Sequence, residues 1–393
     1  IGIDDDFFMT GGDSISAIML CTQLRQRGYG LRPSDVFQFK TVAAIAQQLT
    51  RLDEQQAAIS KPLFSAELEQ KVQEKYGKNS TILPLLPLQK GMLFLSQVEK
   101  QLNYNAFTRL SLNGDIDPVR LQQALITVLK RHPQLGGHFD SELAEEPVFI
   151  YSLHPTQAWP VQFCSVTPDL LEQSIQEVLQ QPIHLDQPYG LIRATLIQHA
   201  PEQSELLIMV HHLLTDGWST PLFLQDFIKA YQQVNQPLPA LEHSYEKVIK
   251  ALSARDHEIS KVIWKRDLAD LQPLILFNQA QQAVQETSYR LSAELGAKLQ
   301  HKLRQQGITL NVFMQMIWAI TLNIYAHRED IVFGTPVSGR SAPINGLEQQ
   351  IGLFLNTIPV RVKLNMQQSL WEQLPHLQQL HVEHLEHDGL GLH

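Results

Sequence analysis

Two short segments place residues that can do chemistry beside glycines that permit a tight turn. In the first, Gly11-Gly12-Asp13 precede Ser14, where a helical pattern begins. We expect the Ser14 hydroxyl to be exposed at a helix N-terminus, where free N–H groups and the helix dipole favour an anion such as a phosphate. A plain helix cap is the other interpretation, because Ser and Asp oxygens satisfy the first N–H groups of a helix.

The second segment follows an apolar run, 205–210, that predicts a buried strand leading into His211 and His212. Successive side chains of a strand point to opposite faces, so we expect the two histidines to have different roles. An imidazole titrates near neutral pH and can serve as a general base. We expect no metal at this pair, because no Cys and no regularly spaced carboxylate–His partner lies nearby.

The residues after the histidines predict a turn that runs into another helix. Gly217 allows the backbone to turn, and the Ser219-Thr220-Pro221 sequence predicts a cap and a first helical turn running toward Tyr231. Asp216, just before the glycine, is compatible with a carboxylate of a catalytic triad or with a structural ion pair.

Periodicity predicts the elements that must hold these residues in place. Helical patterns cover 15–27, 41–49, 118–131 and 170–180, and strand patterns cover 148–151, 205–210 and 330–333. The fold class predicted is a small all-α helical unit followed by a large α/β unit. The polar, Gln- and Glu-rich stretch 51–80 between them predicts a linker, with a short helix possible over 63–76.

Composition excludes several classes of function. The 393 residues hold 31 Lys and Arg against 40 Asp and Glu, giving 31 − 40 = −9, and no basic run forms a nucleic-acid surface. The longest apolar runs are far shorter than the roughly 20 residues of a membrane span, so we expect a cytoplasmic protein without a membrane partner. Cys21 and Cys164 predict ordinary buried thiols.

Side chains outside the two segments have plain structural interpretations. His381, His384 and His387 recur every third residue, for which we expect a solvated helix face and no metal. Trp264 and Trp318 lie in helical patterns and predict core positions.

The acidic Phe-Phe run before Ser14, the apolar helix after it and the Phe37-Gln38-Phe39 step together resemble the phosphopantetheine-attachment region of a peptidyl carrier domain from nonribosomal peptide synthetases. The resemblance covers residues 1–50, the C-terminal part of such a domain, whose first helix precedes the motif in the family. It implies a 4′-phosphopantetheine arm bound covalently to Ser14, attached by a phosphopantetheinyl transferase.

From about residue 82 to 393 the chain resembles condensation domains, which have the chloramphenicol-acetyltransferase-like fold. The His-His-x-x-x-Asp-Gly sequence of 211–217 matches their active-site signature. Further segments that match earlier and later motifs in order are Leu86–Phe94, Arg131–Leu135, Gly334–Arg340 and Ile351–Pro359. Gly136-Gly137 stand where the family commonly has Arg-Thr, and Ser244-Tyr245-Glu246 matches a Tyr-containing motif only loosely; we expect structural divergence there.

The resemblance implies the domains 1–50 (carrier), 51–80 (linker), 81–240 (N-terminal lobe) and 241–393 (C-terminal lobe, expected to be truncated). It implies that His212 is the active-site base or positions the amine, that Gly217 supplies room and a backbone donor, and that His211 is a supporting residue. It also implies a structural ion pair between Asp216 and Arg193.

Similar proteins join a donor acyl thioester on the upstream carrier to the amine of an aminoacyl thioester on a downstream carrier, within larger synthetase modules. An epimerization domain, a noncatalytic carrier-binding platform and a free-standing coenzyme A acyltransferase remain alternatives. A heterocyclization domain would have paired aspartates in place of the His-His core. The two segments therefore predict a carrier joined to an amide-forming acyltransferase.

Overall fold

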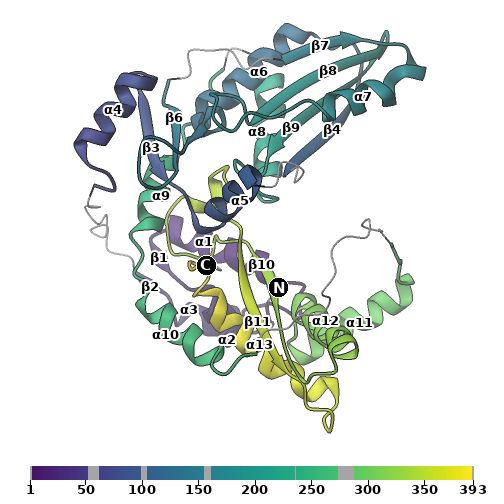
Figure 1. Ribbon diagram of the computed structural model, residues 1–393. Coiled ribbons are helices and arrows are strands. Elements are labelled where there is room, and N and C mark those ends of the chain that lie inside the picture. Colours follow the sequence, from purple (N-terminus) through teal and green to yellow (C-terminus); the bar gives the residue numbers. More distant parts are fainter. Residues whose placement is uncertain are drawn as a thin grey trace. The chain divides into compact units, whose positions relative to one another are not determined.

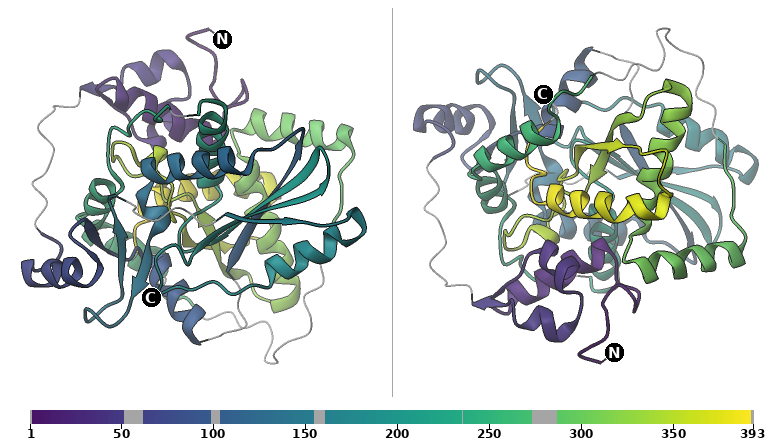
Figure 2. Two further views of the ribbon diagram at one scale, coloured as in Figure 1. Left: turned by 90° about the horizontal axis from the view of Figure 1, so that it is seen from above. Right: turned by 90° about the horizontal axis from the view of Figure 1, so that it is seen from below.

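The computed structural model describes residues 2–51, 62–98, 104–154, 161–234, 236–272 and 287–391 (Figures 1 and 2). They group into two compact units, each built from separate parts of the chain. The first unit comprises 1–57, 256–343 and 356–393, and the second comprises 58–255 and 344–355. The division differs from the predicted ranges, because 344–355 lies in the range expected for the C-terminal lobe and groups with the second unit.

A four-stranded sheet forms the centre of the second unit, in the order β4-β9-β8-β7 (Figure 1). Its strands are β4 (Asn105–Asn113), β9 (Gln203–His211), β8 (Ile192–Ala200) and β7 (Val161–Ser165). The pairing is antiparallel except for the parallel β7–β8 pair. Both faces of β9 are buried, because Leu206, Leu207, Ile208 and Met209 are each 3% exposed or less. The strand predicted over 205–210 is therefore confirmed as an inner strand of this sheet.

Helices cover this sheet and extend from its ends. The helix α7 (Leu171–Leu179) packs through Ile175 and Val178 on Ile197 and Leu207 of the sheet. The helices α6 (Pro118–Arg131) and α8 (Ser219–Gln232) pack on each other. The described part of this unit also contains α5 (Pro87–Val98) and α9 (Tyr245–Ser253). The helices predicted over 118–131 and 170–180 are thus present.

A second, three-stranded sheet has the order β3-β6-β5, from β3 (Ser80–Pro84), β6 (Val148–Ser152) and β5 (His138–Asp140). The helix α4 (Ala66–Tyr76) packs on it through Val72, which is fully buried. The Asp140 carboxylate accepts hydrogen bonds from the Tyr76 hydroxyl (2.6 Å) and the Lys75 ammonium (2.9 Å). Burial alone would raise the pKa of Asp140, but these bonds and two backbone N–H groups lower it to about 2. Part of the range predicted as linker is therefore a helix anchored to this sheet, and residues 52–61 of that range lie outside the described residues.

The glycine pair 136–137 ends a short 3₁₀ turn, Pro133–Gly136, that follows α6. A Cβ at Gly137 would lie 2.2 Å from Cζ of Phe149, and one at Gly136 would lie 2.7 Å from Cε1 of Tyr189. Two aromatic rings thus fill the space that larger side chains would need. This packing explains why the sequence departs from the family pattern here.

The N-terminal part of the first unit contains α1 (Ser14–Gln26), α2 (Pro33–Phe39) and α3 (Val42–Ala46), with short strands β1 (Tyr29–Gly30) and β2 (Thr50–Arg51). The three helices share a small core that includes Ala17, Cys21 and Val36. Burial raises the pKa of the Cys21 thiol to about 12, so Cys21 is an inert core residue. The helix predicted over 15–27 is confirmed, and that predicted over 41–49 is shorter.

In its described residues, the rest of the first unit is a two-stranded sheet with four helices. The strands β10 (Asp330–Val337) and β11 (Asn356–Lys363) pair antiparallel, and the helices are α10 (Glu258–Asp267), α11 (Ala293–Gln306), α12 (Leu310–Ala326) and α13 (Leu370–Leu385). One core joins α12, α13 and this sheet, through residues such as Met316, Ile331 and Leu374. No single helix among the described residues is long and apolar enough to span a membrane; α11 and α12 meet that criterion only as a pair bent by 104°.

The histidines of α13 correct one sequence expectation. His381 and His384 are 4% and 6% exposed, so they do not form a solvated face. Burial lowers the pKa of His381 to about 4, and His384 Nε2 lies 2.7 Å from Oδ2 of Asp267. Both histidines are buried against polar groups of neighbouring helices: His381 meets Asn311 of α12, and His384 meets Asp267 of α10. No cluster of His, Cys, Asp or Glu in the described residues could hold a metal ion.

Trp318 is a second correction, because it is 50% exposed on α12 and does not belong to the core. Helical periodicity alone did not distinguish the two faces of this long apolar helix.

Candidate active site and attachment site

The strand β9 delivers the histidine pair between its two neighbours in the sheet. The His211 N–H donates to the Leu191 carbonyl at the start of β8 (2.9 Å), and the His212 N–H donates to the Tyr104 carbonyl at the start of β4 (2.8 Å). The strand ends at His211, and His212 opens the turn that follows. The two backbone amides are thus tied to opposite neighbours, which fixes the point where the chain leaves the sheet.

The His211 ring is a buried acceptor. It is 5% exposed, and its Nδ1 accepts the Leu213 N–H at 3.2 Å. Burial lowers the pKa of His211 to about 4, with a smaller contribution from the neighbouring His212. The ring is therefore neutral at pH 7, with its acceptor nitrogen committed to the turn. This geometry fits a supporting residue.

The His212 side chain is half-buried, in contrast to His211. Gln89 of α5 holds the turn that carries His212, because its amide nitrogen donates to the Leu213 carbonyl at 2.9 Å. The Gln89 amide oxygen accepts the Leu86 N–H at 2.9 Å, so both ends of this buried amide are bound. The sequence motif around Gln89 matched the family without singling this residue out. Its signal was a polar residue that follows Leu88 in the first turn of an otherwise largely apolar helix.

Asp216 and Ser219 form a buried clamp on the segment 344–355. Asp216 Oδ1 accepts from the N–H (2.9 Å) and the hydroxyl (2.7 Å) of Ser219, and Oδ2 accepts the Phe354 N–H at 3.1 Å. Ser219 Oγ, fully buried, lies 3.0 Å from the Gly352 carbonyl oxygen and 3.1 Å from its nitrogen. One carboxylate therefore starts α8 and fixes a chain segment more than 130 residues away.

The predicted ion pair between Asp216 and Arg193 is wrong for this structure, which describes both side chains. Arg193 Nη2 donates to the Pro182 carbonyl at 2.7 Å, and burial lowers the pKa of its guanidinium. Asp216 has its bonds to Ser219 and Phe354 instead. The reason is local: the arginine contacts the loop before β8, while the aspartate is turned into the start of α8.

Three further bonds hold the same segment within the second unit. Trp218 Nε1 donates to the Glu348 carbonyl (3.0 Å), Gln134 Nε2 donates to the Ile351 carbonyl (2.9 Å), and Gln350 Nε2 donates to the His243 carbonyl (2.8 Å). The motifs around 131–135, 211–219 and 351–359 thus meet at one place. Sequence order matched them, but only the structure shows that they bind one another.

Gly217 is exposed at the outer edge of the turn. A Cβ at this residue would meet no atom within 4 Å in the described structure, in contrast to Gly137. Packing of the fold therefore does not require a glycine here. A requirement for space would come from a molecule bound beside the turn.

Ser14 is the first residue of α1, and its backbone lies where an anion would be favoured. Asp13 caps the helix by accepting the Ser16 N–H at 2.8 Å, and the first turn carries no acidic residue. Gly11 has a φ of 108°, and a Cβ at Gly12 would lie 2.3 Å from the Phe7 ring, so the turn before Ser14 needs both glycines. This tight turn before the first residues of α1 fits a phosphodiester on Ser14.

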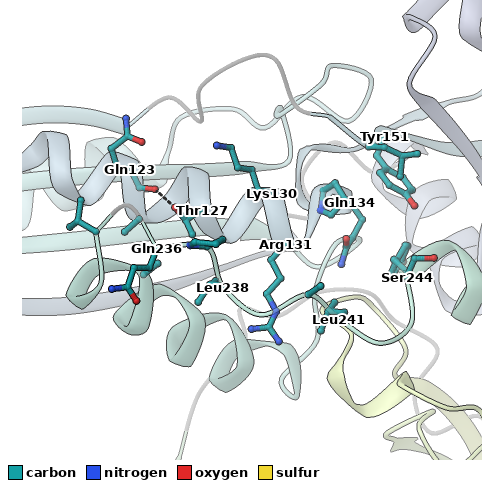
Figure 3. A pocket seen from close by; sticks show the side chains of 18 residues that line it. Gln123, Thr127, Lys130, Arg131, Gln134, Tyr151, Gln236, Leu238, Leu241 and Ser244 are labelled. Carbon is teal, nitrogen blue, oxygen red and sulfur yellow. Dashed lines mark hydrogen bonds between the residues drawn. The ribbon is translucent and has the colours of Figure 1, made fainter.

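A cavity of about 610 Å³ lies in the second unit, between α6 and the connection from α8 to α9 (Figure 3). Figure 3 shows Gln123, Thr127 and Arg131 of α6 on its wall. Neither His211 nor His212 lines it. The cavity therefore does not include the histidine turn.

Comparisons with known proteins agree with this geometry. The family model for the condensation domain matches residues 79–393, and the model for the phosphopantetheine attachment site matches 1–49. The chain is 39% identical over 332 residues to vanchrobactin synthetase VabF of Vibrio anguillarum and 31% identical over 319 residues to a linear gramicidin synthase of Brevibacillus parabrevis. These matches cover 82% and 77% of the chain but only 12% and 6% of the two relatives.

Solved structures support the fold. The X-domain from teicoplanin biosynthesis matches with a TM-score of 0.68 and 22% identity, over 79% of this chain and 72% of that one. The first condensation domain of the calcium-dependent antibiotic synthetase matches with a TM-score of 0.63 and 18% identity, over 80% and 76%. The predicted condensation-domain fold is therefore confirmed. The chain belongs to the condensation-domain family of nonribosomal peptide synthetases and carries a phosphopantetheine attachment site ahead of that domain.

Proposed function

We propose that this chain forms an amide bond between an acyl group carried on Ser14 and the amine of an aminoacyl group on a downstream carrier. The observation that carries the proposal is the His211–Ser219 turn. One histidine is buried, neutral and committed to the backbone, while the next is half-buried and held in place by bonds that do not use its own ring. This arrangement leaves His212 as the group that can work on a substrate.

The reaction needs a proton acceptor or an orienting group beside the amine. The amine nitrogen attacks the acyl carbonyl carbon, the carbon–sulfur bond breaks, and the proton that the amine loses ends on the departing sulfur. His212 either receives that proton on the way or fixes the amine by a hydrogen bond. Gly217, which the fold leaves open, gives room beside the turn for the reacting groups.

The supporting residues act through the turn. His211 accepts the Leu213 N–H, Gln89 binds the Leu213 carbonyl, and Asp216 fixes the start of α8. Each of them restrains the backbone that carries His212. Arg193 has no part in this support, since it binds the loop at Pro182.

Ser14 is the proposed attachment residue for 4′-phosphopantetheine, which when bound carries the acyl group as a thioester. The backbone N–H groups at the very start of α1, before the capped Ser16 N–H, would face the phosphate, and Gly11 and Gly12 hold the turn. A phosphopantetheinyl transferase is the enzyme class that would load it. The helical carrier bundle over 1–50 and the exposure of the Ser14 hydroxyl are parts of the same proposal.

Other synthetase modules are the proposed partners, since the chain spans only a small part of its relatives. The domain boundaries at 50, 80 and 240, the cytoplasmic location and the absence of nucleic-acid or membrane partners stay predictions.

The test measures a single turnover with an acyl group loaded on Ser14 and an aminoacyl carrier supplied separately. His212→Ala should lower the rate of amide formation by about 10²–10⁴, the usual size of a general acid–base contribution. Its fold should stay intact, because the ring is not used to hold the turn. Undiminished product from folded His212→Ala would reject the role of His212.

Loading provides an independent control. Ser14→Ala should gain no mass when incubated with coenzyme A and a broad transferase, whereas the wild-type chain gains one arm. If a loaded Ser14 arm served only as the amine acceptor, the donor assignment would be wrong.

A further inference from the structure

The cavity of about 610 Å³ in the second unit is bounded by α6 and by the part of the α8–α9 connection that covers 236–244 (Figure 3). Its volume lies within the range of small-molecule sites, about 300–1,000 Å³. Arg120 Nε donates to the Tyr231 carbonyl near the end of α8 (2.8 Å), and Gln350 Nε2 donates to the His243 carbonyl (2.8 Å). These bonds tie both ends of the connection to the unit, so the shape of the cavity does not depend on a ligand.

Polar bonds also fix the wall formed by the end of α6. Arg131 Nη1 donates to Oδ1 of Asp226 in α8 (2.8 Å), and His132 Nε2 lies 2.8 Å from Oδ2 of the same carboxylate. Burial lowers the pKa of His132, so its ring is neutral at pH 7 and Asp226 offsets the charge of Arg131. Next along the chain, Gln134 donates from Nε2 to the Ile351 carbonyl at 2.9 Å. This wall is therefore rigid and keeps the side chains of α6 in place.

The cavity wall is positively charged, although the whole chain carries a net charge of −9. Lys130 and Arg131 line the cavity, and none of the described residues that line it is Asp or Glu. Among the described residues, neither Lys130 Nζ nor Arg131 Nη2 has a hydrogen-bond or ion-pair partner. An unpaired ammonium beside guanidinium N–H donors favours an anion such as a carboxylate.

Most of the remaining wall is apolar. Figure 3 shows Leu238 and Leu241 of the connection across from Thr127 and Arg131 of α6, and Leu153 also lines the cavity. An inorganic anion would leave this surface in contact with water, whereas an apolar chain attached to the carboxylate would bury it. The cavity thus combines a cationic end of α6 with space for a hydrocarbon chain.

We propose that this cavity binds a small organic anion, a carboxylate with an apolar chain. The carboxylate lies at Lys130 and Arg131, and the chain packs against Leu238 and Leu241. The site does not include the His211–Ser219 turn. The inference concerns binding only and does not depend on the role of His212.

The test titrates the full chain with octanoate and follows the NMR signals of labelled leucine methyl groups. The signals of Leu153, Leu238 and Leu241 should shift together and give one Kd. Leu310, which is 49% exposed on α12, reports binding to apolar surface elsewhere and should not follow the same curve. Octanol has the same chain without the charge and should bind about tenfold more weakly, because it cannot form the charge-assisted hydrogen bonds. Acetate has the charge without the chain and should also bind more weakly.

Two variants and one matched control test the assigned residues. Lys130→Gln should raise the Kd of octanoate about threefold, the effect that an exposed ion pair supports. Lys229→Gln should leave the Kd unchanged, because Lys229 is an exposed lysine of α8 that does not line the cavity. Thr127→Phe places a ring in the cavity and should abolish the methyl shifts. The Thr127 hydroxyl donates to the Gln123 carbonyl of its own helix, so its loss breaks no bond between elements.

The helix dipole also favours basic residues at the end of α6, so the measurement is of binding and not of stability alone. The proposal is wrong if octanol binds as tightly as octanoate, or if the Leu310 signal follows the same curve as the three cavity leucines. It is also wrong if Lys130→Gln and Lys229→Gln give the same Kd, or if folded Thr127→Phe binds octanoate as the unmodified chain does. Melting curves check the fold of each variant, and the exposed Lys130 position keeps the test decisive if Thr127→Phe does not fold.

Discussion

The two turns to which we assign the proposed functions share one local structure and differ in what surrounds it. Asp13 and Asp216 each precede a helix and accept the N–H of a serine three residues later, at 2.8 Å and 2.9 Å. In both turns the serine hydroxyl also donates to the same carboxylate oxygen, at 2.7 Å. Nothing in the short sequence Asp-x-x-Ser separates the two.

The two turns differ in how deeply their side chains are buried. Asp13 is exposed, and its bonds end within its own turn, whereas Asp216 and Ser219 are 5% and 0% exposed. The buried pair also holds the Phe354 N–H and both backbone groups of Gly352. The comparison teaches that a surface cap positions only the helix that follows it, while the same cap in the interior fixes distant chain as well. In the proposed function, the attachment residue Ser14 lies at the first kind of turn and His212 at the second.

The largest difference is expected when each aspartate is removed. Asp216→Ala leaves several buried donors without an acceptor, at about 1–3 kcal/mol each, so we expect a loss of about 3 kcal/mol in the free energy of unfolding of the second unit. Asp13→Ala should cost about 1 kcal/mol, the usual value for a surface cap. Urea unfolding followed by NMR signals of each unit checks this, and equal losses would contradict the comparison.

Double-mutant cycles sharpen the comparison further. Asp216→Ala with Ser219→Ala should show a coupling energy of about 1 kcal/mol or more, because the two side chains share one network. Asp216→Ala with Arg193→Ala should be additive within about 0.5 kcal/mol, because they bind different partners. Strong coupling in the second cycle would instead indicate that Asp216 and Arg193 do interact.

Acidification should loosen the buried turn through His211. Its pKa is about 4 in the folded chain and about 6.5 in an unfolded one, so the unfolded chain binds more protons between these values. The stability contributed by neutral His211 is therefore complete above pH 6.5 and is lost as the pH falls toward 4. Protection of the Leu213 N–H from hydrogen exchange should fall in this window.

The surface turn provides the reference for that measurement. The Ser16 N–H is held by Asp13 and has no imidazole partner, so its protection should change less once intrinsic exchange is corrected. Replacing the ring with His211→Gln should remove the extra pH dependence at Leu213. Unchanged pH dependence in that variant would show that another group is responsible.

The smallest effect on stability is expected at the exposed edge of the buried turn. Gly217→Ala should change the free energy of unfolding by less than about 0.5 kcal/mol, as for other surface substitutions, because a Cβ there meets no neighbour. If the open space serves the reacting groups, the single-turnover rate of amide formation should fall clearly although the melting temperature stays nearly unchanged. Melting temperature and single-turnover rate, measured on the same preparation, separate the two effects.

Local patterns in the sequence predicted the elements and the order of the motifs well. The strand before His211 has an unbroken apolar run, and the helix α6 has a regular apolar stripe, so each was placed from periodicity alone. The turn at Asp216 was predicted from Gly217 and the cap-like Ser219. These features depend only on neighbours in the chain.

Partners distant in sequence were not predictable in the same way. The family pattern suggested Arg193 as the partner of Asp216, but the carboxylate instead binds Ser219 and Phe354. The burial of His381 was missed because its polar neighbours, Asn311 and Gln315, lie on another helix. A helix surface in a single sequence shows which residues share a face, and it does not show what that face meets.

The division of the chain has a consequence for the order of synthesis. Residues 344–355 belong to the second unit, although 88 residues of the first unit, 256–343, precede them. On a ribosome, the Asp216–Ser219 clamp therefore stays open until Gly352 and Phe354 have emerged. A hybrid protein in which the chain after residue 255 comes from a relative would likewise combine the histidine turn with a foreign 344–355 segment, which supplies the backbone groups that bind Asp216 and Ser219. Hybrid chains should keep 211–219 and 344–355 from one parent.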